Sequence, residues 1–168
     1  MVAADVDETP DPLPLDVVVR RLARRKADAV ARRIARGTLL GADTVIDLDG
    51  ELLGKPDSAA GARAMLARLS GRTHAVHTGV ALVHCATGLV EDGSATSRVR
   101  FRPIAAEEIA RYVASGEPMG KSGSYAIQGG AAAFLESLTG EVDNVVGLPR
   151  RLVAELAAVL AGRIAARG

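Results

Sequence analysis

The stretch LLGADTVIDL, residues 39–48, is the clearest structural signal in the chain. Its apolar and β-branched residues predict a strand, and the Asp49-Gly50 pair that follows predicts a tight turn into a short partner strand. Asp43 stands inside this apolar run, where a carboxylate is costly to bury unless it is paired or bound to a metal. Asp43 is therefore a candidate catalytic or metal-binding residue, and an aspartate that only caps a neighbouring turn is the alternative.

Helices and further strands are expected on both sides of this hairpin. Asp16 is a candidate cap for a helix that runs to about Arg36, with Gly37 as its stop signal. The pattern also predicts helices over 58–69, 105–115 and 149–166, and strands over 74–85, 97–101, 131–138 and 142–146, of which the last two are expected to pair. The alternation of strands and helices predicts a single α/β domain with a mixed sheet.

Composition narrows the class of protein. The 168 residues suit one domain, and 48% are apolar but only 2% aromatic, so the core is expected to be aliphatic. A net charge of +1 does not favour a nucleic-acid or membrane-surface partner. The single cysteine fits a cytoplasmic protein, and the sequence shows neither an apolar signal core near its start nor an apolar run of about 20 residues.

Lys26 is unusual because it falls on the apolar side of its predicted helix. On a helical wheel it lies in the stripe that contains Val19, Leu22 and Ala23, whereas most of the neighbouring arginines lie off it. A lysine there suggests a cation that points into a cleft. The alternative is a lysine that extends its ammonium to the rim. The arginines suggest a nucleic-acid surface less than a solvated face, because no aromatic stacking residues accompany them.

Two short motifs supply further charged candidates. Lys55 lies in Gly54-Lys55-Pro56, where a held lysine suits phosphate oxygens, although the tetrapeptide around it is not a Walker loop. Glu8 follows a predicted strand end in a proline-rich loop. Carboxylates of this kind can hold Mg²⁺ between protein and phosphates, and an exposed acidic loop is the alternative.

The glycine-rich stretch over 120–130 is the last candidate binding segment. Glycines let backbone N–H groups face a ligand, and Gln128 can both donate and accept hydrogen bonds, as recognition of a base edge requires. A flexible surface loop is the alternative. Zinc is disfavoured, because His74 and His77 are three apart on one predicted strand and so point to opposite faces.

Taken in order, these motifs resemble the Maf family over nearly the whole chain. The blocks that carry the resemblance are Val6-Asp7-Glu8, residues 23–27 (ARRKA), residues 41–45 (GADTV), residues 53–56 (LGKP), residues 69–74 (LSGRTH), Thr78-Gly79-Val80, residues 123–129 (GSYAIQG) and residues 144–149 (NVVGLP). Maf proteins are nucleoside triphosphate pyrophosphatases that release pyrophosphate and leave the monophosphate. The form Ile127-Gln128-Gly129 is similar to the branch that acts on dTTP and UTP.

The resemblance implies a fold and a role for each candidate. It implies an elongated mixed sheet flanked by helices, with two lobes around a cleft, as in Maf and inosine triphosphatase-like proteins. By position, Asp43 matches the catalytic proton acceptor, and Glu8 matches an acidic residue of the site for Mg²⁺ or Mn²⁺, to which Asp43 also belongs. Lys26 and Lys55 match phosphate-binding lysines, and Thr44 and Gln128 match positions tied to substrate choice.

One departure from the family concerns the start of the chain. Members begin with a strand and a Ser-x-Ser-Pro-Arg-Arg loop, and no such segment precedes Val6-Asp7-Glu8 in this sequence. We therefore expect a single Maf-like domain over 1–168 that is truncated at its N-terminus, either because the start was assigned too far downstream or because the protein is weakened. In the second case a nucleotide-binding regulator linked to septum formation is the alternative function. A homodimer is compatible with the family.

Overall fold

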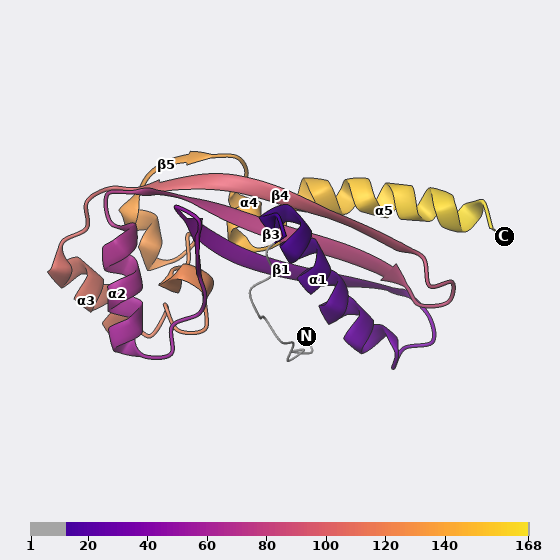
Figure 1. Cartoon of the computed structure of the whole chain (residues 1–168), viewed down its shortest axis with the longest axis horizontal. Coiled ribbons are helices and arrows are strands. Elements are labelled where there is room, and N and C mark those ends of the chain that lie inside the picture. The colour runs from indigo at the N-terminus through magenta and orange to yellow at the C-terminus, as the bar shows by residue number, and fades with distance from the viewer. Residues whose placement is uncertain (1–12, 168) are drawn as a thin grey trace. The chain divides into compact units, whose positions relative to one another are not determined.

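The computed structural model describes residues 13–167 (Figure 1). The predicted strand end over residues 1–6 and the loop that holds Glu8 lie outside the described residues. The elements follow in the order α1 (Leu15–Ala31), β1 (Thr38–Leu48), β2 (Glu51–Leu53), α2 (Ala59–Leu69), β3 (Thr73–His84), β4 (Val90–Phe101), α3 (Ala106–Ala114), two 3-10 turns (Ser122–Ser124 and Gly130–Phe134), β5 (Leu135–Thr139), α4 (Val142–Val146) and α5 (Arg150–Ala165). The predicted α/β class is confirmed.

The strands form one sheet in the order β2-β1-β3-β4-β5. Both β1–β2 and β4–β5 are antiparallel pairs. The Cys85 N–H donates to the Gly37 carbonyl oxygen over 2.9 Å, which joins the end of β3 to the start of β1, and a turn joins β3 directly to β4. The described sheet is therefore antiparallel rather than mixed. The helix α2 does connect two parallel strands, β2 and β3, but β1 lies between them.

By its internal contacts the chain divides into two compact units. Unit 1 holds Met1–Thr44, Thr78–Ala95 and Gly147–Gly168, and unit 2 holds Val45–His77 and Thr96–Val146. The strands β1, β3 and β4 each run through both units, so the units share their strands along the chain. The single-domain organisation stays a prediction.

Along β1, the buried positions change from odd to even residue numbers near the boundary between Thr44 and Val45, where the chain passes from unit 1 to unit 2. Gly41 and Asp43 are buried in the first part of the strand, and Ile46 and Leu48 are buried in the second. Because side chains alternate between the faces of a strand, a shift from odd to even positions means that the buried face changes. Asp43 therefore belongs to the packing of unit 1.

In unit 1, α1 lies against one face of the sheet at a distance that only glycine permits. A Cβ atom at Gly79 would lie 2.2 Å from the backbone of Val19, and one at Gly41 would lie 2.2 Å from the carbonyl oxygen of Ala23. Figure 1 shows α1 crossing β1 and β3 at this point. These glycines bring the backbone of α1 close to the strands.

The opposite face of unit 1 packs against α5. Leu82 and Leu89 form a small apolar cluster with Leu160 of this helix. Leu82 is three residues from Gly79 on β3, so the two point to opposite faces. The predicted helix over 149–166 is confirmed as Arg150–Ala165, with Pro149 just before it.

The first helix is shorter than the sequence predicts. It ends at Ala31 rather than near Arg36, and Asp16 lies inside its first turn without capping it. An acidic residue there still favours the helix through the dipole. Ile34 is exposed, so a further turn would have no packing to stabilise it. Residues 32–37 instead lead into β1.

Unit 2 holds the larger apolar core, covered by α2 and α3. The two helices pack side by side (Figure 1). Ser58 caps α2 by accepting the Gly61 N–H over 3.0 Å. At the other end of α2, the Ser70 hydroxyl oxygen accepts the Ile104 N–H over 2.7 Å and so fixes the segment that leads into α3.

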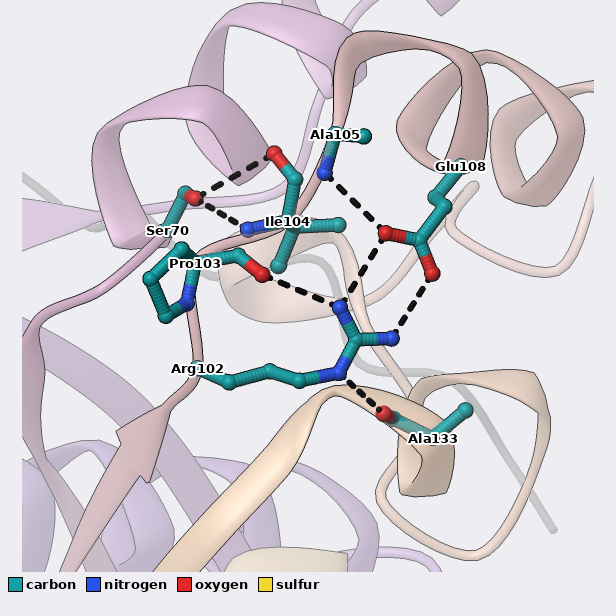
Figure 2. A network of polar contacts seen from close by, with 7 residues as sticks. All are labelled: Ser70, Arg102, Pro103, Ile104, Ala105, Glu108 and Ala133. Atoms are coloured by element: carbon teal, nitrogen blue, oxygen red, sulfur yellow. Dashed lines mark hydrogen bonds and ion pairs between the residues drawn. The ribbon is translucent and has the colours of Figure 1, made fainter.

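A guanidinium organises the start of α3 (Figure 2). Arg102 donates through two nitrogens to Glu108, over 3.1 and 2.7 Å, and through Nε to the Ala133 carbonyl oxygen over 3.0 Å. The Glu108 carboxylate also accepts the Ala105 N–H over 3.1 Å. The hydrogen bonds from Arg102 and then from Ala105 lower the pKa of Glu108 to about 2. One ion pair therefore ties β4, α3 and the second 3-10 turn together.

The predicted hairpin over 131–146 is wrong. Residues 130–134 form a 3-10 turn, β5 pairs with β4, and residues 142–146 form the short helix α4. Asn144 explains this helix, because its buried amide donates to the Val76 carbonyl oxygen over 3.1 Å and to the Ser97 hydroxyl over 2.9 Å. These contacts involve one side chain, so they do not depend on the alternation of side chains that a strand would impose.

Across residues 13–167, no helix is both long and apolar enough to cross a membrane.

Candidate active site

A largely buried ion pair of unit 1 joins α1 to β1. The ammonium of Lys26 donates to Oδ1 of Asp43. The Asp43 side chain is only 7% exposed, and that of Lys26 is 25% exposed. A carboxylate withdrawn from water to this degree needs a compensating charge, and Lys26 supplies it. Asp43 is thus paired with a cation, and its assignment as a catalytic or metal-binding residue stays a prediction.

The local sequence explains why these two residues meet. Gly41 allows α1 to approach β1, and Asp43 lies two residues further along the same face of the strand. On the helix, Ala23 and Ala27 are buried against the sheet, and Lys26 lies beside them at the edge of the buried stripe. The small residues thus set the separation, and the long lysine side chain spans it.

Thr44 does not join this pair. As the next residue along β1 it points to the other face, where its hydroxyl forms a 2.9 Å hydrogen bond with the hydroxyl of Thr78. Thr78 is fully buried, and a Cβ atom at Gly147 would lie 3.1 Å from Oγ1 of Thr44. Thr44 is therefore held by a buried hydroxyl on β3 and by close packing of the segment before α5.

Lys55 and Gln128 belong to unit 2 and are both exposed. The segments that carry them are linked, because the Gly123 N–H donates to the Gly54 carbonyl oxygen over 2.9 Å. The glycine-rich stretch over 120–130 is thus attached to the loop of Lys55. Part of this stretch is buried, because Gly123 and Ser124 lie in a buried 3-10 turn. This burial disfavours the alternative of a flexible surface loop.

Gln128 lies in a tight turn, Ala126–Gly130. The Gly129 N–H donates to the Ala126 carbonyl oxygen over 3.0 Å. The side chain of Ile127 is buried in the core of unit 2, while Gln128 next to it is exposed. The apolar neighbour therefore anchors the turn and leaves the amide of Gln128 accessible to a ligand.

Comparison of the sequence with known proteins shows the family of this chain. The family model described as Maf-like protein matches residues 1–160. The chain belongs to the Maf family. Its relatives include proteins named dTTP/UTP pyrophosphatase from Aromatoleum aromaticum, 48% identical over 91% of this chain and 76% of the relative, and from Pelotomaculum thermopropionicum, 46% identical over 93% and 82%. Another from Symbiobacterium thermophilum is 53% identical over 79% of this chain and 67% of the relative.

The Maf resemblance assigns two residues, Asp43 and Glu8, to a metal ion. Asp43 offers a carboxylate, the hard oxygen ligand that Mg²⁺ and Mn²⁺ prefer. Glu8 lies outside the described residues. Within 13–167, no group of three or more His, Cys, Asp and Glu side chains could hold a metal ion. Mg²⁺ usually takes one or two carboxylates and completes its shell with water and substrate phosphates, so Asp43 fits such an ion bound together with substrate.

Two histidines of this Maf chain, His74 and His77, form hydrogen bonds with hydroxyl groups of the protein. His74 is buried, and its Nε2 forms a 2.8 Å hydrogen bond with the Tyr125 hydroxyl. Burial lowers the pKa of His74 to about 4, so the ring is neutral at pH 7. His77 instead pairs with the hydroxyl of Thr96 over 3.0 Å. The two histidines thus have separate hydrogen-bond partners, on Tyr125 and on β4.

Sequence reasoning missed the side chains that hold the turn of Gln128. Tyr112 and Glu117 both form hydrogen bonds to backbone N–H groups of the Ala126–Gly130 turn. Tyr112 lies 14 residues and Glu117 lies 13 residues before the backbone group that it binds, and hydrogen bonds from a side chain to a distant backbone group leave no periodic signal in a sequence. The adjacent glycines at 129 and 130 were the visible trace, because they mark a place where the backbone approaches another group closely.

Proposed function

We propose that this chain is a nucleoside triphosphate pyrophosphatase that converts dTTP, UTP or modified forms of them to the monophosphate and pyrophosphate. The relatives named dTTP/UTP pyrophosphatase support the reaction and the substrate class. The single observation that carries the proposal is the buried carboxylate of Asp43 with the ammonium of Lys26 on it. Cleavage between the α- and β-phosphates requires an oriented water and a neutralised phosphate charge, and this pair offers a group for each.

In this proposal Asp43 accepts the proton of the attacking water. A carboxylate can orient a water through one hydrogen bond and take its proton as the oxygen bonds to phosphorus. Burial keeps Asp43 away from bulk water, which strengthens its interactions within the site. Its position in the regular backbone of β1 limits its movement, and such preorganisation is what a general base needs.

Lys26 compensates charge in this proposal. In the free protein its ammonium neutralises Asp43, and once substrate is bound the same ammonium can donate to phosphate oxygens. Lys55 is proposed to bind phosphate as well, since it is exposed and follows Gly54 and precedes a proline that stiffens the backbone. Thr44 and Gln128 are proposed to determine which base is accepted.

A divalent cation, Mg²⁺ or Mn²⁺, is proposed as cofactor. Asp43, and Glu8 by its match to the family, would hold it. When bound, it would neutralise the negative charge that collects on the phosphate oxygens as the pyrophosphate leaves. This proposal also places the protein in the cytoplasm, where these nucleotides are made.

Pyrophosphate release by the purified 168-residue chain tests the proposal. The assay uses dTTP, UTP, CTP, GTP and ATP, each with Mg²⁺, with Mn²⁺ and with a chelator. We expect turnover that requires the metal and is fastest with dTTP or UTP, with the monophosphate as the other product. Phosphate rather than pyrophosphate as the product, or no turnover by folded protein, would contradict the proposal. Nucleotide binding without turnover would favour the role of a regulator.

A further inference from the structure

We propose that Tyr112 and Glu117 are positioning residues that fix the turn Ala126–Gly130 and so determine how selectively Gln128 recognises the base. This inference rests on the proposed function and deepens it. The two residues are defined here as the Tyr112–Glu117 bracket. Neither has a role in the chemistry at phosphorus, and both act through the backbone of the turn.

The bracket closes a ring of hydrogen bonds around the turn. The Ala126 N–H donates to the Tyr112 hydroxyl oxygen over 3.0 Å, and the Tyr112 hydroxyl donates to Oε1 of Glu117 over 3.3 Å. The Gly130 N–H then donates to the Glu117 carboxylate, 3.2 Å from Oε1 and 3.1 Å from Oε2. The first and last residues of the turn are thus bound to two side chains that are bound to each other.

The bracket is itself held in place. The ring of Tyr112 is 7% exposed and packs edge-on against Phe134, with ring centroids 5.3 Å apart. Ser115 accepts the Glu117 N–H over 3.2 Å and donates to the Tyr112 carbonyl oxygen over 2.6 Å. Lys121 donates to the Glu117 carbonyl oxygen over 2.7 Å. Each half of the bracket therefore has support beyond its contact with the turn.

The turn packs closely against the bracket at Gly129 and Gly130. A Cβ atom at Gly129 would lie 1.8 Å from Oε1 of Glu117, and one at Gly130 would lie 3.0 Å from Cδ2 of Tyr112. A side chain at position 129 would therefore require the carboxylate of Glu117 to move, and one at position 130 would make a tight contact with the Tyr112 ring. This close fit distinguishes the turn from a loop that is merely near α3.

The position of Gln128 follows from this arrangement. Its side chain is exposed and belongs to the short segment between the two anchored residues, and the anchors restrict the backbone from which the amide projects. An amide can discriminate bases only if its donor and its acceptor are both correctly placed, since uracil offers an acceptor at O4 and a donor at N3, whereas cytosine offers a donor at N4 and an acceptor at N3. In a fixed turn, the amide can form good hydrogen bonds with one base and poor ones with the other.

The test is a double-mutant cycle on base discrimination. Tyr112→Phe and Glu117→Gln are made in the wild-type and Gln128→Ala backgrounds, and kcat/KM is measured for UTP and CTP. Phe keeps the buried ring, Gln keeps the size of Glu117, and Glu107→Gln makes the same charge change at an exposed site on α3. We expect each bracket variant to lower the UTP-to-CTP ratio about three- to tenfold in the wild-type background, with kcat for UTP changed by less than about twofold.

The cycle has a second readout that does not depend on activity. Amide hydrogen exchange of the peptide that spans 126–130 should become faster in both bracket variants and stay unchanged in Glu107→Gln. In the Gln128→Ala background, we expect the bracket variants to leave the UTP-to-CTP ratio unchanged. A residue that merely stabilised unit 2 would lower activity toward all nucleotides alike.

The outcomes separate this inference from the function on which it rests. Wild-type turnover with unchanged base ratios in both bracket variants would overturn the inference alone. A loss of discrimination that persists in the Gln128→Ala background would also overturn it, because the bracket would then act through something other than Gln128. No turnover of any nucleotide by the folded wild-type chain would overturn the proposed function and this inference together.

Discussion

The Lys26–Asp43 pair and the Ala126–Gly130 turn are both proposed to act on substrate, yet they are held in opposite ways. Asp43 lies in a regular strand, and a helix presses against that strand through glycine and alanine contacts. The turn lies outside the strands and α-helices, and side chains of Tyr112 and Glu117 bind its backbone N–H groups. In the first region the backbone positions the side chain, and in the second region side chains position the backbone.

The difference follows from what each region is proposed to do. A carboxylate that accepts a proton needs to be desolvated and fixed, and the backbone of a packed strand provides both. A group that recognises a base needs an exposed amide, and an exposed amide cannot be fixed by burial of its own side chain. Hydrogen bonds to the backbone on either side of it are then the available means.

The largest expected effect is in the first region. Asp43→Asn keeps the size of the side chain and removes the proton acceptor, so we expect kcat to fall by about 10³-fold or more for every nucleotide. Nucleotide binding, measured by calorimetry, should persist. The control is Asp47→Asn on the same strand, which should keep wild-type turnover because Asp47 only accepts the Gly50 N–H at the turn. Wild-type turnover by Asp43→Asn would end its assignment as the base.

The next effect concerns the buried histidine that contacts Tyr125, just before the turn. The folded pKa of His74 is about 4 and its unfolded value is 6.5. Between these values the unfolded chain binds the proton more tightly, so stability falls as the pH falls from about 6.5 toward 4, by about 3 kcal/mol in all. Chemical denaturation at pH 7, 6, 5 and 4 measures this loss.

His74→Gln removes the titrating ring and should flatten that part of the pH profile. His84→Asn serves as the control, because His84 lies at the end of β3 and contacts Thr87 in an exposed turn. The same steep loss of stability in the His74→Gln variant would show that another group is responsible.

A smaller effect tests the close approach of α1 to the sheet. Gly79→Ala places a Cβ atom 2.2 Å from the Val19 backbone. We expect a loss of about 2 kcal/mol in stability, because the helix has to move away. Movement of α1 should also separate Lys26 from Asp43 and lower kcat/KM.

The matched control is Gly162→Ala in α5. Nothing lies within 4 Å of the added Cβ atom, and alanine favours a helix over glycine by about 0.5–1 kcal/mol. We therefore expect Gly162→Ala to raise the denaturation midpoint slightly. A Gly79→Ala protein as stable as the wild type would contradict the packing described for unit 1.

The sequence points to Lys26, Asp43 and Gln128 as candidates, but it does not reveal the side chains that hold the turn of Gln128. Lys26 was conspicuous as a cation on an apolar stripe, and Asp43 as a carboxylate within an apolar strand, because both violate the periodic pattern of a regular element. The structure brings these two side chains into contact, and their roles in binding and catalysis stay predictions. The Tyr112–Glu117 bracket violates no pattern, since a tyrosine and a glutamate at a helix end are ordinary.

The errors in the predicted fold also come from long-range contacts that leave no local pattern in the sequence. The segment over 142–146 is rich in valine and was expected to be a strand, but tertiary contacts of Asn144 make it helical. The mixed sheet was expected from the alternation of strands and helices, which does not reveal that β1 lies between β2 and β3. The hairpin at Asp49-Gly50 was predicted correctly, because its turn residues are local and both adopt a positive φ.

The measurement that tests the comparison most directly is the dTTP-to-CTP ratio of kcat/KM in Lys26→Met and Gln128→Ala. We expect Lys26→Met to lower kcat/KM for both nucleotides by the same factor, about 10- to 100-fold, and so to leave the ratio unchanged. Gln128→Ala should lower the ratio and leave kcat for dTTP nearly intact. A changed ratio in Lys26→Met, or an unchanged ratio in Gln128→Ala, would contradict the division between a region for chemistry and a region for base choice.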